Sequence, residues 1–145
     1  MELSSSAFAN GGAVPRRYSC EGEDLSPPLE WAAVPGDAVS HALIVDDPDA
    51  PVGTFTHWLA WGMDPEDRGL AEGEHAPREG RNDFRGVGYR GPCPPRGHGP
   101  HRYFFRLYAL ASEPALRSGA SRRDLERAIE DNVLAVAELV GTYER

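Results

Sequence analysis

The sequence predicts a mostly β fold with many short strands and one convincing helix, and three observations carry this prediction. The chain has 145 residues, enough for one ordinary domain, which we expect to span 1–145. Its 16 Gly and 13 Pro are spread along the whole length, as is typical of short strands joined by loops. Apolar runs lie between these turn residues, and only one segment has a helical pattern.

Three segments are the predicted core strands. Residues 41–47 (HALIVDD) form an apolar run that ends in carboxylates and opens into a turn. Residues 56–63 are rich in aromatic side chains, and residues 101–111 alternate apolar and mixed faces over their length. The polar segment 64–85 has little periodicity, so we expect a long surface excursion with at most a short strand.

The helix is predicted near 121–138. Ser121 is a suitable N-cap and Asp124 occupies the capping-box position, while apolar residues continue at helical spacing as far as Val140. Residues 139–145 are predicted to form a closing strand. No internal repeat or domain boundary is visible.

Charge and hydropathy exclude several classes of protein. The net charge is −8, and all 15 basic residues are arginine, which disfavours nucleic-acid binding through a basic face and excludes lysine chemistry. No apolar run approaches the roughly 20 residues of a membrane span. The amino terminus lacks the basic and apolar regions of a signal peptide, so we expect a cytoplasmic protein.

Two loops carry candidate chemistry. In VDDPDAP (45–51) three carboxylates repel one another, which costs stability unless a function uses them. The alternative is a structural Asx-turn in which Asp47 caps the loop backbone. In the loop that starts at Gly91, His98 and His101 have metal-like spacing, but the Gly and Pro between them exclude a helix, so we expect no metal site. The prolines also exclude a phosphate nest and leave only isolated amide donors, which suits a small anion.

Catalysis is the minority interpretation. Cys93 stands between two prolines in an extended loop, not at a helix N-terminus that would activate its thiol, and no GxSxG motif presents a serine. Cys20 and Cys93 are expected to be unpaired thiols, and a bridge would require the fold to bring their two loops together. His57, beside Trp58 on a strand, is by itself more typical of a structural group, and pleat alternation places these two side chains on opposite faces.

Taken in order, these segments resemble the phosphatidylethanolamine-binding protein family, also called the Raf kinase inhibitor-like proteins, and especially its short bacterial and archaeal branch. The resemblance spans essentially the whole chain. It is carried by SPPLEW (26–31), ALIVDDPDAP (42–51), HW (57–58), GYRGPCPP (88–95), HRYFFRLYAL (101–110) and ELVGTY (138–143).

The resemblance implies a Greek-key β-sandwich with a few peripheral helices and a small pocket for phosphate, phosphorylethanolamine or a carboxylate. It further implies a cis peptide at Ala50–Pro51 and a homodimer, and no cofactor. His98 is outside the implied ligand set and is expected to be a solvated loop residue, and the direction of Arg90 at the pocket rim is left open. The implied ligand-binding residues are Asp47, Asp49, Pro51, His57, Cys93, Pro95, His101 and Tyr103.

Three functions remain open at this point. The favoured one is a non-enzymatic, regulatory binding module, since family members inhibit kinases or proteases. In it, Asp47 or Asp49 would keep His57 or His101 protonated as a cationic donor. The alternatives are a small hydrolase that uses Cys93 or His57, and an interaction protein whose pocket is vestigial. If the two cysteine loops meet, a redox-sensitive pair could also alter the pocket.

Overall fold

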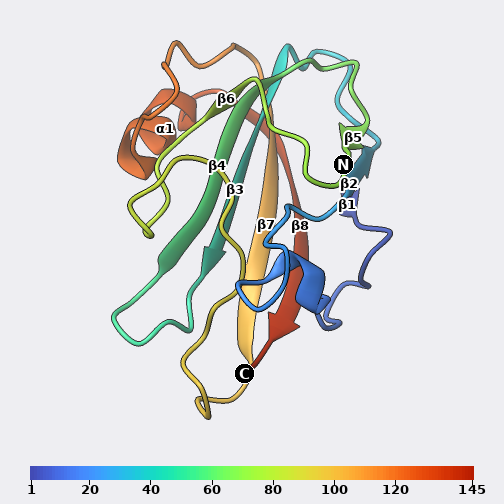
Figure 1. Cartoon of the computed structure of the whole chain (residues 1–145). Coiled ribbons are helices and arrows are strands. Elements are labelled where there is room, and N and C mark those ends of the chain that lie inside the picture. Colours follow the sequence, from blue (N-terminus) through green and yellow to red (C-terminus); the bar gives the residue numbers. More distant parts are fainter.

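The computed structural model describes residues 1–145 and consists of two antiparallel sheets (Figure 1). It confirms the mostly β fold that the strand-and-loop pattern predicts and the sandwich that the resemblance implies. The smaller sheet has the strand order β1-β2-β5, and the larger has the order β6-β4-β3-β7-β8. The elements are β1 (Glu2–Ser4), the 3-10 turn η1 (Arg16–Tyr18), β2 (Leu29–Ala32), β3 (Ser40–Asp47), β4 (Phe55–Met63), β5 (Gly69–Leu70), β6 (Arg78–Glu79), β7 (His101–Leu110), α1 (Arg122–Ile129) and β8 (Val133–Tyr143).

The three predicted core strands are confirmed as β3, β4 and β7. β3 lies at the centre of the larger sheet, between β4 and β7, and every one of its residues is buried. This explains why its sequence is a continuous apolar run instead of an alternating one. The polar excursion between β4 and β7 contributes only β5 and β6, each of two residues.

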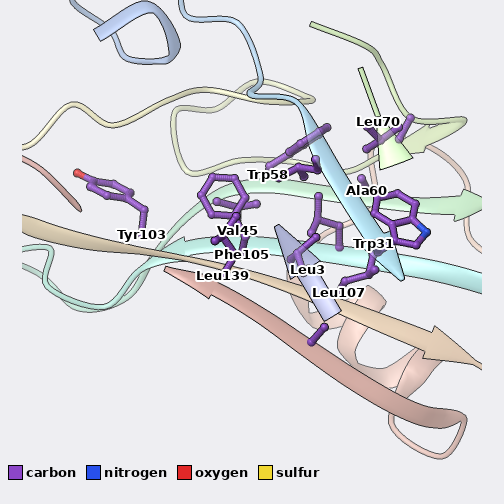
Figure 2. Packing of buried hydrophobic residues seen from close by; sticks show 14 of the residues in the cluster. Leu3, Trp31, Val45, Trp58, Ala60, Leu70, Tyr103, Phe105, Leu107 and Leu139 are labelled. Atoms are coloured by element: carbon purple, nitrogen blue, oxygen red, sulfur yellow. The ribbon is translucent and has the colours of Figure 1, made fainter. Parts of the chain in front are cut away.

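The main core lies between the two sheets, where Trp31 of the smaller sheet packs with Trp58, Phe105 and Leu139 of the larger one (Figure 2). A second apolar cluster covers the opposite face of the larger sheet beneath α1, whose Leu125 is completely buried there. The larger sheet is therefore covered on both faces at one end. No helix is long and apolar enough to cross a membrane.

The predicted helix is shorter than expected. Ser121 caps it and forms the predicted capping box with Asp124, but α1 ends at Ile129. The following valines, which match helical spacing, belong to β8 instead, where Ala137, Leu139 and Gly141 alternate inward. Pairing along β7 outweighs the helical pattern because it satisfies the backbone groups of β8 and buries these inward side chains.

Candidate functional site

A cavity of about 290 Å³ opens at one end of the larger sheet. It lies where β3 ends and where β4 and β7 begin, close to the loop that precedes β7, at the lower end of the view in Figure 1. All of the predicted ligand-binding residues except Asp49 line it. Its lining is Asp47, Ala50, Pro51, Val52, Phe55, His57, Phe84, Cys93, Pro94, Pro95, His101 and Tyr103.

Several apolar residues of the lining were not predicted from the sequence, and Phe84 is the most informative of them. It lies in the polar excursion before β7, and its ring packs edge-on against Phe55 with centroids 4.8 Å apart. The only signal in the sequence was a single aromatic residue in a polar segment. The guanidinium of Arg90 lies 4.9 Å from the centroid of the same ring and pairs with Asp24, which settles the direction of that side chain.

The three clustered carboxylates diverge, and each has its own cationic or imidazole partner. Asp46 pairs with Arg122 of α1 at 2.8 Å, and Asp47 contacts Nδ1 of His101 at 2.6 Å. Asp49 accepts hydrogen bonds from the backbone amide and the guanidinium of Arg102. The hydrogen bonds from Arg102 lower the pKa of Asp49 to about 2. Asp49 therefore holds the turn against β7 and, alone among the predicted ligand-binding residues, is not part of the cavity lining.

The turn after β3 is also built differently from the expectation. The structure contains no cis peptide bond, so Ala50–Pro51 is trans. The chain reverses through a turn in which the Gly53 amide donates to the Ala50 carbonyl at 3.2 Å. Gly53 has a φ of 111°, a conformation that side chains rarely adopt. Glycine thus supplies the reversal.

His57 is positioned by a β-bulge. The pairing of β3 with β4 shifts register between Val45, opposite Trp58, and Asp46, opposite Thr56, so His57 has no partner on β3. A bulge interrupts the strict alternation of side chains along a strand. The prediction that His57 and Trp58 lie on opposite faces, which rests on that alternation, therefore does not hold here. Its ring packs edge-on against Tyr103, with centroids 5.3 Å apart.

One ring nitrogen of His57 is already used. Nδ1–H donates to the backbone carbonyl of Arg90 at 2.7 Å, since a carbonyl can only accept. Burial lowers the pKa of His57, against the opposing effects of this hydrogen bond and of Asp47. His57 is therefore a neutral imidazole near neutral pH, with its Nε2 lone pair free, and not the cationic donor that the sequence suggested.

The Tyr103 hydroxyl is the second free polar group of the cavity. Tyr103 is 1% exposed, and its hydroxyl has no hydrogen-bond partner within the chain. Burial raises the pKa of Tyr103 most, and the charge of Asp47 and a weak contact with its carboxylate add to this effect, so this hydroxyl stays protonated. An unpaired buried hydroxyl costs free energy and is a ready partner for a ligand.

His101 has no free ring nitrogen. Its Nδ1 contacts Asp47, and its Nε2 lies 2.6 Å from Nδ1 of His98. His98, expected to be only a solvated loop residue, is exposed but directly contacts the buried His101. The proline and glycine content of the loop hid this contact, because it arises from a turn and not from a regular element.

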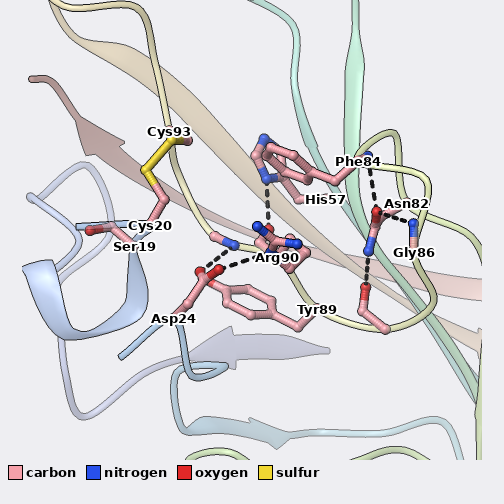
Figure 3. A network of polar contacts seen from close by, with 12 residues as sticks. Ser19, Cys20, Asp24, His57, Asn82, Phe84, Gly86, Tyr89, Arg90 and Cys93 are labelled. Carbon is pink, nitrogen blue, oxygen red and sulfur yellow. Dashed lines mark hydrogen bonds and ion pairs between the residues drawn. A yellow bond between two sulfur atoms is a disulfide. The ribbon is translucent and has the colours of Figure 1, made fainter. Parts of the chain in front are cut away.

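The loop that lines the cavity is anchored to the segment after η1 (Figure 3). Cys20 and Cys93 form a disulfide, contrary to the expectation of two unpaired thiols. Asp24 also accepts from the Gly91 amide at 2.7 Å, and a Cβ on Gly91 would collide with the Tyr18 carbonyl. The two loops meet this closely only in the folded chain, which is why their sequence separation gave no indication of the bond.

The disulfide removes Cys93 as a nucleophile while the bond is intact, because a catalytic cysteine must be a free thiolate. The bond also weighs against the cytoplasmic location, which remains a prediction, because disulfides are rare in reducing compartments. No group of three His, Cys, Asp or Glu side chains is arranged to hold a metal ion.

Together, fold and site define a two-sheet β-sandwich with a histidine- and tyrosine-containing pocket at one end of its larger sheet. The family model described as phosphatidylethanolamine-binding protein matches residues 4–144. The chain belongs to this family.

Relatives span nearly the whole chain. A UPF0098 protein of Methanothermobacter thermautotrophicus is 49% identical, with 100% of this chain and 99% of the relative covered. One from Pyrococcus abyssi is 48% identical, with 97% and 84% covered. These relatives agree with the predicted bacterial and archaeal branch.

Solved structures agree with the fold. A crystal structure from Chlamydia trachomatis, described as that of a phosphatidylethanolamine-binding protein homologue, has a TM-score of 0.94 and 39% identity, covering 99% of this chain and 97% of that one. Escherichia coli YbcL, described as a member of the mammalian PEBP family, has a TM-score of 0.93 and 29% identity, covering 99% and 98%.

Proposed function

We propose that this protein is a non-enzymatic binding module whose cavity accepts a small anion, a phosphate or a carboxylate. One observation carries the proposal: the unpaired hydroxyl of Tyr103 and the unused Nε2 of His57 line one cavity that is otherwise largely apolar. A protonated anion such as monohydrogen phosphate can accept from Tyr103 and donate to His57 at the same time. The family name supports a phosphate-bearing ligand such as phosphorylethanolamine.

The cavity favours a ligand with a small apolar body. Proline and phenylalanine side chains form much of its lining, and about 290 Å³ is at the lower end of the size of ligand pockets. The amide of Cys93, a residue of the cavity lining, makes no hydrogen bond within the chain and is one further candidate donor. Rigid, already placed groups bind without a large cost in ordering.

The hydrolase alternative has less support. Cys93 is in a disulfide, and Nδ1 of His57 contacts a backbone carbonyl instead of the carboxylate that orients a catalytic histidine. His101 has the carboxylate partner of a general base in Asp47, but its Nε2 is occupied by His98. No serine, threonine or free thiol lines the cavity, so the nucleophile that this chemistry requires is missing.

Isothermal titration calorimetry with inorganic phosphate, acetate and phosphorylethanolamine tests the proposal. We expect saturable binding of at least one of them and no turnover of p-nitrophenyl phosphate or p-nitrophenyl acetate. Vesicles of phosphatidylethanolamine form a separate arm, which distinguishes a lipid headgroup from a free phosphate. Absence of binding, or turnover that His57→Gln abolishes, would contradict the proposal.

A regulatory protein partner, as for kinase- or protease-inhibiting family members, and a homodimer belong to the same proposal. Residues 10–14 pair with the end of β8, but no strand pairs with the outer edge of its beginning. Val136 is 50% exposed on that part of the strand, and Leu134 is 38% exposed. Unpaired edges with apolar side chains are typical sites of strand pairing between chains. Light scattering of the wild type and of Val136→Glu tests this: a monomeric wild type would contradict the homodimer.

A further inference from the structure

His101 is sealed on both sides within the chain. The carboxylate of Asp47 accepts from its Nδ1–H, and the imidazole of His98 contacts its Nε2 at 2.6 Å. An anion that is to be bound by His101 must therefore replace one of these two partners. The way in which the pocket binds its ligand therefore depends on which of these two partners can be displaced.

Asp47 is the fixed partner. It is buried at the end of the central strand β3, and its second oxygen accepts from the amide of Asp49 at 2.7 Å. His98 is the movable partner, because it is exposed and lies between Gly97 and Gly99, both of which have a positive φ. Nothing lies within 4 Å of the Cβ positions of these two glycines, so the loop has open space around it.

The contact between the two imidazoles is possible only in certain protonation states. The contact needs one N–H and one lone pair between Nε2 of His101 and Nδ1 of His98. It is therefore compatible with a neutral pair or with one shared positive charge. When both rings are protonated, both facing nitrogens carry hydrogen and the contact must open.

We propose that His98 is a displaceable cap, whose lone pair occupies the position on His101 that an anionic oxygen of the ligand takes over. The proposal rests on the proposed function, since it assigns a mode of regulation to the same pocket. Binding exchanges the imidazole of His98 for the anion, which then accepts from Nε2–H of His101, while Asp47 keeps its contact with Nδ1. Part of the ligand's interaction energy is then used to release His98.

Other charged and titratable groups surround the pair. Asp49, paired with Arg102, acts on His101 from the turn, and Tyr103 and His57 line the same cavity. Arg96 lies on the same loop and pairs with Glu21, and Arg145 donates to the Pro94 carbonyl. None of these groups takes the place of His98 at Nε2 of His101.

Sulfate binding to the wild type and to His98→Ala tests the proposal, with His75→Ala as the matched control. His75 is an exposed histidine outside the cavity lining, and sulfate keeps its charge where imidazoles titrate. Near about pH 7.5 we expect His98→Ala to bind sulfate about five- to tenfold more tightly, the effect of removing one competing hydrogen bond.

The outcomes separate the two proposals. If the wild type binds sulfate and His98→Ala binds it equally well or more weakly, the cap is wrong and the anion pocket stands. If no protein binds sulfate, phosphate or acetate, the anion pocket is wrong and the cap fails with it.

A measurement without ligand checks the contact itself. Nitrogen-15 NMR of the histidine rings follows the titration of His101 in the wild type and in His98→Ala. We expect the His101 titration curve to change when His98 is removed and to stay the same in His75→Ala. An unchanged curve in His98→Ala would overturn the cap even if the pocket binds anions.

Discussion

Nδ1–H of His57 donates to the carbonyl of Arg90 over 2.7 Å, and this bond decides which nitrogen of the imidazole remains for a ligand. The same carbonyl belongs to the loop that Asp24 holds through Arg90 and Gly91. The orientation of His57 therefore depends on a segment far away in the sequence. Its remaining nitrogen, Nε2, is an acceptor while the ring is neutral and a donor once it is protonated.

Anion binding should raise the pKa of His57. In the free protein, burial places this pKa below its ordinary value of about 6.5, so the ring is neutral near neutral pH. A bound anion favours the protonated ring, and affinity for sulfate should therefore fall as pH rises through the pKa of His57. Histidine NMR titrations with and without sulfate measure the shift, with His75 as an internal control. A pKa of His57 that sulfate leaves unchanged would count against the pocket.

Tyr103→Phe should separate binding from stability. The hydroxyl has no partner in the free protein, so its removal should leave the free energy of unfolding unchanged or raise it by up to about 1 kcal/mol. Phosphate affinity should fall by about tenfold or more, the loss of a hydrogen bond to a charged group. Calorimetry and urea unfolding measure the two effects.

Tyr89→Phe is the matched control for this change. The Tyr89 hydroxyl donates to the Tyr18 carbonyl at 2.6 Å, so its loss should lower stability by about 1 kcal/mol and leave phosphate affinity largely unchanged. If Tyr103→Phe instead behaves like Tyr89→Phe, the Tyr103 hydroxyl has a structural partner and does not contact the ligand.

Replacing both cysteines with serine should clearly lower the free energy of unfolding but change the phosphate affinity only slightly. The bond joins residues separated by 73 positions, and loss of such a cross-link typically costs about 2–4 kcal/mol. Asp24 continues to hold Arg90 and Gly91, so phosphate affinity should change by less than about threefold. Urea unfolding and calorimetry of Cys20→Ser/Cys93→Ser test this. A much larger loss of affinity would instead support a redox-sensitive pocket.

The sequence predicts the central strands well because burial there follows simple patterns. β3 is a continuous apolar run and β7 alternates along its length, so both were found nearly to the residue. The apolar spacing led to a wrong prediction where it is compatible with both a helix and a strand. Val133 and Val136 match both a continued helix and a strand, and only pairing with β7 decides between them.

The unpredicted parts of the site depend on contacts between distant segments. The resemblance brought His57, His101 and Tyr103 together, but the bulge that orients His57 leaves no mark in a single sequence. The same holds for the pairing of Asp49 with Arg102 and for the disulfide. Each requires two loops to meet, which local propensity does not encode.

A buried histidine outside the pocket should make the protein less stable in acid. His41 is 0% exposed, packs against Trp31, and has no hydrogen-bond partner on either ring nitrogen. Burial lowers its pKa, against the opposing effect of a weak contact with the backbone of Tyr108, so the folded state stays neutral at a pH where the unfolded chain already binds a proton. The free energy of unfolding therefore falls as pH decreases below about 6.5, and stops falling through this residue once the pH is below the pKa of the folded state.

His41→Leu should reduce this loss of stability in acid without abolishing it, because His57 contributes with the same sign. Urea unfolding at about pH 7.5 and about pH 5.5 measures the loss, which should be smaller than in the wild type by up to about 1 kcal/mol. His75→Leu, at an exposed position, should keep the wild-type loss. An equal loss in His41→Leu and the wild type would mean that His41 takes up its proton in the folded state, with a partner or water that satisfies its ring.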